Sequence, residues 1–275
     1  MTLLVVGASG HLGATICRLA PAVGWRVIGT YATAAGRAAG IDWQRLDLRD
    51  PVAVRDLVTA VRPTAVINAA YRYADWAVSA DGAAHLARTS MEVGARLVHV
   101  SSDVVHGGRP DPYADDEAPT PILPYGAAKA AAETAVRVLD PGAALVRTSL
   151  IIGDEHSKQV RLCLDLITGR AAGALFSDEF RCPVGVDDLA AAVLELVDSR
   201  FAGVVNVAGP EAVSRPQLGA LVARRYGLDA SRLPVSTIAE AGLVRPAEIR
   251  LDTALAGRLL RTRLRPVSEI LAGSG

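Results

Sequence analysis

A phenol and an ammonium stand four residues apart in the segment Tyr125–Lys129. On a helix this spacing places the two side chains on one face, one above the other. An ordinary tyrosine has a pKa of about 10, and a nearby cation moves that pKa toward neutrality. Ser102, at the end of an apolar run, adds a hydroxyl that can hydrogen-bond the same substrate oxygen. Together these groups are typical of hydride transfer to or from a carbon–oxygen centre.

A Tyr–Lys pair with this spacing also occurs by chance on helix surfaces, so its setting has to decide. The pair follows, further along the chain, a glycine pattern typical of dinucleotide-binding loops. Lys129 is also one of only two lysines, the other being Lys158, whereas arginine supplies the remaining positive charge. A compact ammonium with an adjustable pKa at this position favours a catalytic role.

The glycine pattern is the stretch from Gly7 to Gly13, which closes a short apolar strand and opens an amphipathic helix. Gly7 permits the tight turn, Gly10 leaves room for the backbone to approach a phosphate, and Gly13 lets the helix lie close to the sheet. Free N–H groups at the helix start would then face a pyrophosphate. The alternative, a turn that binds nothing, fits the strand–loop–helix–strand context less well.

Charge balance limits the class of partner. The chain has 275 residues, and Lys plus Arg and Asp plus Glu both total 29. No overall electrostatic reason therefore exists to expect nucleic acid or an anionic membrane surface. We expect a small-molecule ligand, no nucleic acid and no membrane.

Cysteine usage and hydropathy indicate the compartment. Cys17, Cys163 and Cys182 lie far apart, without the paired spacing of metal ligands, and their odd number argues against a disulfide framework. The N-terminal apolar run has no basic leader, and no run reaches the roughly 18 apolar residues of a membrane span. We therefore expect no metal site and a reducing, cytoplasmic setting.

Strands alternating with helices predict an α/β fold built on a doubly wound parallel (Rossmann) sheet. The predicted strands cover residues 3–6, 26–29, 65–68, 96–101 and 144–147, and helices between them include 52–61 and 82–93. Later helical patterns, interrupted by Pro and Gly, cover 160–166, 188–197, 217–226 and 253–260. The segment 107–123, with four prolines and several acidic residues, is interpreted as a solvated loop at the rim of the site.

The weakening of this alternation after residue 150 predicts two units. A dinucleotide-binding Rossmann domain covers residues 1–150, and residues 184–207 return to its sheet. Residues 151–183 and 208–275 form a smaller C-terminal lobe that binds the substrate.

Taken together, the motifs resemble the extended short-chain dehydrogenases/reductases, specifically the dTDP-4-dehydrorhamnose reductase-like branch. The likeness runs along most of the chain. Its carriers are Gly7–Gly13, Leu46–Asp50, Asn68–Tyr71, Ser101–Asp103, Pro124–Gly126 with Lys129, Val146–Ser149, Arg181–Val184 and Asp187–Ala190.

The resemblance implies that Ser102, Tyr125 and Lys129 form the catalytic triad. Tyr125 would be the general acid, and Lys129 would also hold the nicotinamide ribose. The cofactor-binding residues implied in this way are Gly7, Ser9, Gly10, His11, Leu12, Gly13, Tyr31, Asp47, Leu48, Ala69, Ala70 and Tyr71, together with Tyr125 and Lys129.

The predicted substrate-binding residues are Asp103, Val104, Arg147, Leu150 and Arg181. Arg147 and Arg181 offer bidentate forks for a diphosphate, with a structural role for Arg147 as the alternative. Asp103 either binds substrate hydroxyls, as the resemblance suggests, or anchors its loop.

The sequence departs from this branch at residues expected to contact the substrate. Val104, His106 and Leu150 stand where the branch has aromatic residues, and Ser79 stands where it has a helix-kinking asparagine. We therefore expect dTDP-4-dehydrorhamnose itself to be a poor substrate. His106 is expected to be an exposed loop residue.

The predicted activity is NAD(P)H-dependent reduction of a keto sugar, nucleotide-linked, with tyrosine as the general acid. The alternatives are a sugar-nucleotide epimerase or dehydratase, and a non-catalytic NADP-binding regulatory subunit. NADP(H) is favoured over NAD(H), because the second strand ends in Gly29–Thr33 without an acidic residue for the ribose. Arg37 or Thr33 would then accept the 2′-phosphate. The sequence leaves a homodimer open.

Overall fold

The central sheet of the computed structural model has seven strands in the order β11-β6-β5-β4-β1-β2-β3. Every neighbouring pair in it is parallel, so the predicted doubly wound sheet is confirmed. The structure describes residues 1–272, and residues 273–275 of the predicted C-terminal lobe lie outside the described residues. The strands are β1 (Thr2–Val6), β2 (Arg26–Tyr31), β3 (Asp42–Arg45), β4 (Ala65–Asn68), β5 (Arg96–Val100), β6 (Ala144–Arg147) and β11 (Gly203–Asn206).

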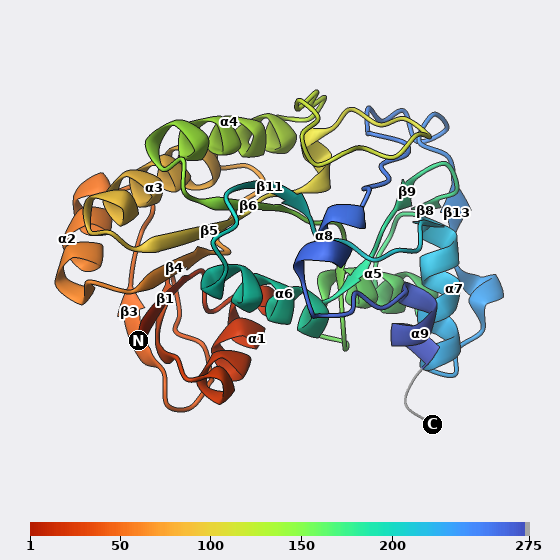
Figure 1. Cartoon of the computed structure of the whole chain (residues 1–275). Helices are drawn as coiled ribbons and strands as arrows, with labels where there is room; N and C mark the ends of the chain where they lie inside the picture. Colours follow the sequence, from red (N-terminus) through yellow and green to blue (C-terminus); the bar gives the residue numbers. More distant parts are fainter. Residues whose placement is uncertain (273–275) are drawn as a thin grey trace.

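Helices cover both faces of this sheet (Figure 1). Side chains alternate between the faces along a strand, so Leu3 and Val5 of β1 join one core cluster while Leu4 and Val6 join the other. Since both faces are covered, the strands are nearly continuously apolar. One face carries α1 (His11–Leu19), α6 (Val186–Asp198) and α8 (Ala254–Leu259), and the other carries α2 (Pro51–Val61), α3 (Gly82–Glu92) and α4 (Pro124–Leu139).

A third hydrophobic cluster lies in the C-terminal part of the chain, whose elements stand at the right of Figure 1. Its helices are α5 (Lys158–Ile167), α7 (Arg215–Arg225) and α9 (Val267–Ala272). Three two-stranded pairs accompany them: β7 (Ile151–Ile152) with β10 (Val184–Gly185), β9 (Phe180–Arg181) with β12 (Val213–Ser214), and β8 (Leu175–Phe176) with β13 (Val235–Ser236). The chain between β10 and β12 returns to the central sheet. It forms α6, which packs on one face, and β11, which pairs with β6.

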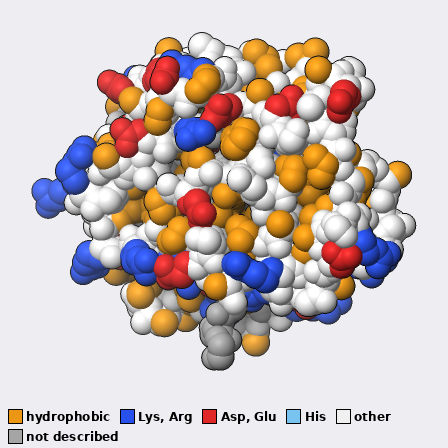
Figure 2. Space-filling model, turned by 90° about the vertical axis from the view of Figure 1, so that its right-hand side faces the viewer, with side chains coloured by type: hydrophobic (Ala, Val, Ile, Leu, Met, Phe, Trp, Pro, Cys, Tyr) orange, Lys and Arg blue, Asp and Glu red, His pale blue; other side chains and the backbone are white. Residues whose placement is uncertain are grey.

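Short helical turns complete the described chain. They are the 3-10 turns η1 (Ala20–Val23), η3 (Asp103–Val105) and η4 (Ala230–Arg232), and the π-helical segment η2 (Ala77–Asp81). Within residues 1–272, no helix combines the length and apolar character needed to cross a membrane. Figure 2 views the face formed by the C-terminal elements, where acidic, basic and hydrophobic side chains are interspersed.

Local sequence explains where several elements begin. Asp50 precedes α2 and its carboxylate accepts hydrogen bonds from the N–H groups of Val52 and Ala53, at 2.9 and 3.1 Å. Pro51 and Pro124 stand in the first turns of α2 and α4, where proline is tolerated. The predicted strands 65–68 and 144–147 have the observed bounds. Strand β3 was missed because it is a polar edge strand of sequence DWQR.

The three glycines of the first loop have different requirements. Gly7 has φ +80°, and a Cβ there would lie 2.8 Å from backbone atoms of Ala70. A Cβ at Gly13 would lie 2.2 Å from the carbonyl oxygen of Gly7. Gly10 is freer, since its Cβ would lie 3.3 Å from that same oxygen. The fold therefore requires Gly7 and Gly13, whereas Gly10 leaves its space for a ligand.

Replacing Gly10 and Gly13 by valine separates binding from folding. Gly13→Val should lower the free energy of unfolding by roughly 1–3 kcal/mol, because its side chain overpacks the loop. Gly10→Val should lower it by no more than about 1 kcal/mol, as at other helix N-cap positions, but should abolish dinucleotide binding. Urea unfolding and fluorescence titration with NADPH measure the two effects. Unchanged NADPH affinity in Gly10→Val would show that the phosphate site lies elsewhere.

Candidate active site

The cleft that contains the predicted catalytic residues has a volume of about 520 Å³. It follows the carboxyl ends of β1, β4 and β5, the sheet edge at which α/β proteins bind ligands. Ser102, Tyr125 and Lys129 all line it. So do all the predicted cofactor residues, which are Gly7, Ser9, Gly10, His11, Leu12, Gly13, Tyr31, Asp47, Leu48, Ala69, Ala70 and Tyr71.

Helix α4 positions both Tyr125 and Lys129. Tyr125 lies in its first turn, and Lys129, one turn later, is only 2% exposed. The Lys129 ammonium donates a hydrogen bond of 2.8 Å to the carbonyl oxygen of Val100, at the end of β5. Burial lowers the pKa of Lys129 to about 8, and the Glu133 carboxylate opposes that change. The ammonium therefore titrates close to physiological pH.

The pKa of Tyr125 differs from the sequence-based expectation. We expected the nearby cation to lower it, but burial raises the pKa of Tyr125 well above its usual value. The phenols of Tyr73 and Tyr71 and the carboxylate of Asp103 act in the same direction. Burial disfavours the phenolate. Tyr125 is therefore a protonated phenol, which is the form that donates a proton.

Ser102 is held by its neighbour Asp103. The Ser102 hydroxyl donates a 3.2 Å hydrogen bond to Asp103 Oδ1, and Ser149 Oγ donates one of 2.7 Å to Oδ2. Arg181 Nε lies 3.7 Å from the same Oδ2. Burial raises the pKa of Asp103, and Arg181 opposes that effect. Asp103 thus anchors its loop while also lining the cleft, so both roles considered for it remain compatible with its position.

Arg147 is wrongly predicted as a substrate contact. It is 1% exposed and is not among the residues that line the cleft. Its guanidinium pairs with Glu133 at 2.8 Å and donates to the carbonyl oxygen of Glu117 at 2.9 Å. The guanidinium is therefore occupied by structural partners, which the sequence alone does not reveal because they are distant in the chain.

The other four predicted substrate residues, Asp103, Val104, Leu150 and Arg181, line the cleft. The guanidinium of Arg181 is not fully free to bind a ligand, since it donates to the carbonyl oxygens of Pro246 and Ala247 at 2.7 and 3.0 Å. Its charge therefore balances nearby carboxylates and fixes the adjoining backbone.

The expectation of an exposed His106 is wrong. His106 is fully buried and its ring stacks on Tyr113, with centroids 3.9 Å apart. Burial lowers the pKa of His106 to about 4, with Arg147 acting in the same direction, so the imidazole is neutral. Tyr113 itself is only 4% exposed, so the loop 107–123 is packed at its middle rather than solvated throughout. The aromatic partner within the loop is what draws His106 inward.

Ser79 lies in the π-helical segment η2. Its hydroxyl donates to the carbonyl oxygen of Arg72 at 2.8 Å and accepts from the N–H of Arg72 at 3.1 Å. The helix is therefore distorted at this position although asparagine is absent, and the distortion holds the loop that follows β4. Such π-bulges are frequent at functional sites.

An aromatic cluster, of which the sequence analysis named Tyr71 but missed Tyr73, covers the phenol of Tyr125. The ring of Tyr73 lies 4.4 Å from that of Tyr125, and the ring of Tyr71 lies 5.9 Å from it. Lys158 reaches this cluster from α5, with its ammonium 5.3 Å from the Tyr71 ring centroid. Tyr73 remains 59% exposed and lines the cleft. The signal was available, because both tyrosines directly follow a buried strand.

Basic side chains dominate the end of the cleft formed by C-terminal elements. Lys158, Arg181, Arg215 and Arg245 line it there, with Glu179 as an acidic neighbour. Arg215 donates to Gln159 Oε1 at 2.8 Å. Cations outnumber carboxylates in this part of the cleft, which suits an anionic ligand.

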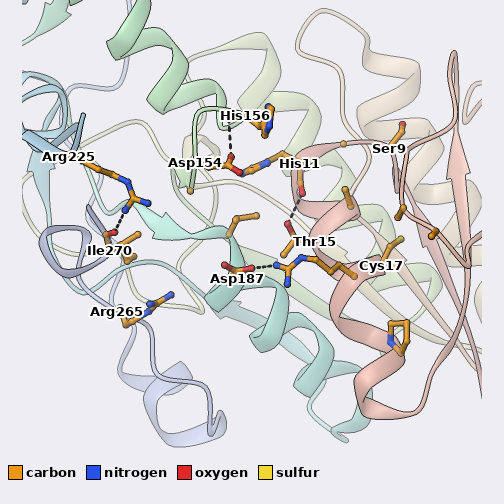
Figure 3. Close-up of a pocket in the computed structure, with 18 of the residues that line it drawn as sticks. Ser9, His11, Thr15, Cys17, Asp154, His156, Asp187, Arg225, Arg265 and Ile270 are labelled. Atoms are coloured by element: carbon orange, nitrogen blue, oxygen red, sulfur yellow. Dashed lines mark hydrogen bonds and ion pairs between the residues drawn. The ribbon is translucent and has the colours of Figure 1, made fainter. Parts of the chain in front are cut away.

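A larger groove of about 1240 Å³ lies on the other side of the first loop (Figure 3). Its arginines are already paired: Arg18 with Asp187, and Arg225 with the carbonyl oxygen of Ile270. His11 points into it toward Asp154 (Figure 3). Ser102, Tyr125 and Lys129 are not among the described residues that line this groove. The smaller cleft is therefore the candidate active site.

Comparison with known proteins relates the whole chain to one family. Residues 1–272 match the family described as RmlD substrate binding domain. The dTDP-4-dehydrorhamnose reductase of Mycobacterium tuberculosis is 32% identical, over 93% of this chain and 85% of that protein.

Two further relatives extend this comparison. Methionine adenosyltransferase 2 subunit beta of Xenopus tropicalis is 29% identical, over 90% of this chain and 79% of that protein. The crystal structure of dTDP-4-dehydrorhamnose reductase from Bacillus anthracis in complex with NADP is similar in fold, with a TM-score of 0.84 and 23% identity. That similarity covers 98% of this chain and 96% of that one.

Proposed function

The chain belongs to the RmlD substrate binding domain family, within the extended short-chain dehydrogenases/reductases, and we propose that it is an NAD(P)H-dependent reductase of a nucleotide-linked keto sugar. One observation carries this proposal. Ser102, Tyr125 and Lys129 line the same cleft as the glycine loop that would hold a dinucleotide.

The first turn of α1 is suited to a pyrophosphate. Its N-cap residue is Gly10, and within residues 1–272 no side chain caps the helix and no acidic residue lies in the first turn. A helix start of this kind attracts an anion through its N–H groups and dipole. The open space beside the Cα atom of Gly10 also supports placing the pyrophosphate here. When bound, the nicotinamide dinucleotide supplies the hydride.

Side chains of the protein then protonate and hydrogen-bond the substrate oxygen. Tyr125 donates its phenolic proton to the alkoxide that develops as the carbonyl carbon is reduced. Ser102 hydrogen-bonds the same oxygen. The Lys129 ammonium stabilises the phenolate that remains on Tyr125. In the cleft without substrate the Ser102 hydroxyl donates to Asp103 Oδ1, and on substrate binding it turns to donate to the substrate oxygen instead.

Substrate recognition is proposed to combine an aromatic surface with a basic end. Lys158, Arg215 and Arg245 line the basic end of the cleft, where they would contact a diphosphate. For this reason we propose a nucleotide-linked substrate. Tyr73 supplies a ring face for the sugar, although Val104 and Leu150 are aliphatic. That dTDP-4-dehydrorhamnose is a poor substrate stays a prediction, and Tyr73 supplies from another loop an aromatic contact that Val104 and Leu150 lack.

We favour NADP(H) as the cofactor. Thr33 lines the cleft beyond β2, whereas Arg37 is not among the lining residues, so Thr33 is the better of the two predicted phosphate contacts. Asp47 is also near, but Arg49 pairs with it at 2.6 Å. Hydrogen bonds from Arg49 lower the pKa of Asp47 to about 2. The charge of this carboxylate is therefore balanced, and Arg49 stands at the same end of the cleft.

Tyr125→Phe tests the activity. It should lower kcat for reduction of a keto-sugar nucleotide by about 10²- to 10⁴-fold, because the general acid is lost. Titration should give a lower Kd for NADP(H) than for NAD(H), in the wild type and the variant alike, because the ring still packs. Turnover close to the wild-type value in Tyr125→Phe would remove the mechanism. A wild-type protein that binds cofactor but reduces no sugar nucleotide would favour the regulatory-subunit alternative.

Tyr73→Ala tests substrate recognition. An aromatic contact contributes roughly 0.5–1.5 kcal/mol, so KM for the keto-sugar nucleotide should rise about 2- to 10-fold. Tyr73→Phe keeps the ring and is the matched control, with KM close to the wild-type value. Equal KM values for the alanine and phenylalanine variants would show that the ring does not contact substrate.

A further inference from the structure

Three side chains of α4 lie one turn apart on one helix face: Tyr125, Lys129 and Glu133. Lys129 and Glu133 are each 2% exposed. A buried ammonium is costly without a compensating charge and hydrogen bond. Lys129 has the hydrogen bond from its ammonium to Val100, so the remaining question is what supplies the negative charge.

Glu133 is held rigidly at this place. Its Oε1 accepts a 2.6 Å hydrogen bond from Ser101, which directly precedes the catalytic Ser102. Arg147 on β6 donates to Oε1 and Oε2 at 3.1 and 2.8 Å. The carboxylate is therefore fixed by Arg147 of β6 and by Ser101 after β5, and Glu133 itself lies one helical turn from Lys129 along α4.

Arg147 is itself fixed from the far side. Its Nη1 donates to the carbonyl oxygens of Glu117 and Asp115, at 2.9 and 3.3 Å, and lies 3.4 Å from the imidazole of His106. The rim loop thus prevents the guanidinium from leaving Glu133. Nothing in this arrangement requires Arg147 to contact a ligand.

We propose that Glu133 is a positioning residue of the active site, whose buried carboxylate, one helical turn from the equally buried Lys129, keeps that side chain a charged ammonium. It touches neither substrate nor cofactor and acts through Lys129. The role of Lys129 in turnover rests on the proposed function, whereas the charge of Lys129 does not.

The groups that face this pair come from each adjoining element. From β5, His99 lies near Lys129 and is neutral, because burial and the ammonium hold the pKa of His99 well below its usual value. From β6 comes Arg147, and from the rim loop come Glu117 and Asp115, which meet Arg147 rather than Lys129. Glu133 is the charged group that raises the pKa of Lys129 against burial.

The sign of the pH effect follows. Without the carboxylate, the pKa of Lys129 falls further, so the ammonium loses its proton at lower pH. If turnover needs the charged form, kcat declines on the alkaline side, and this decline moves to lower pH as well.

NMR of the protein with ¹³C-labelled lysine measures the pKa of Lys129 directly, because the chain has only two lysines, Lys129 and Lys158. We expect the Lys129 resonance to titrate near pH 8 in the wild type. In Glu133→Gln its midpoint should fall by about 1 pH unit, as for loss of a neighbouring opposite charge. Lys158→Arg assigns the two signals. Ser101→Ala is the matched control, since it removes a hydrogen bond to Glu133 but no charge, and its midpoint should match the wild type.

If Glu133→Gln does not fold because Arg147 is left unpaired, the double variant Glu133→Gln/Arg147→Met removes both charges. Its downward shift should be smaller than that of Glu133→Gln, because loss of the Arg147 cation raises the pKa of Lys129. An unchanged midpoint in a folded variant would overturn the proposal, as would an equal shift in Ser101→Ala. The kcat profile against pH is recorded in parallel. A shifted NMR midpoint in Glu133→Gln, with no activity in the wild type or in any variant, would contradict the proposed function. It would still support the effect of Glu133 on the charge of Lys129.

Discussion

The buried hydrogen bond from the Lys129 ammonium to the carbonyl oxygen of Val100 fixes how helix α4 meets the sheet. An ammonium inside the protein must find an acceptor, and the end of β5 offers one. With Lys129 fixed, Tyr125 faces the cleft one turn earlier and Glu133 meets Arg147 one turn later. Gly126 allows α4 to lie close to η3, since a Cβ there would lie 2.1 Å from the carbonyl oxygen of Val104.

The two parts of the chain contribute different chemistry to the cleft. The sheet edge and α4 supply a glycine loop, the phenol of Tyr125 and the buried ammonium of Lys129. The C-terminal elements supply the basic side chains Lys158, Arg215 and Arg245. A ligand that joins a reducible carbonyl to a diphosphate would meet both parts at once. Tyr71 and Tyr73 lie between them, in contact with Lys158 on one side and Tyr125 on the other.

Local patterns in the sequence predicted the parallel sheet and most of its helices, because burial on both faces leaves continuous apolar strands and because Asp50 and Pro51 mark a helix start. Contacts between residues far apart in the sequence could not be predicted from these local patterns. Arg147 pairs with Glu133 and with a loop thirty residues away, and His106 stacks on Tyr113. The raised pKa of Tyr125 has a similar origin, since its burial and its neighbours Tyr73 and Tyr71 arise only in the folded chain.

The central claim is that this cleft transfers a hydride from a nicotinamide dinucleotide to a sugar carbonyl. Incubation with a nucleotide-linked 4-keto sugar and NADPH deuterated at C4 of the nicotinamide tests it most directly. We expect one deuterium on the former carbonyl carbon of the product, in a single stereochemical configuration, with one NADP⁺ formed for each product. An altered sugar without deuterium and without net oxidation of NADPH would contradict it and would identify an epimerase or dehydratase instead.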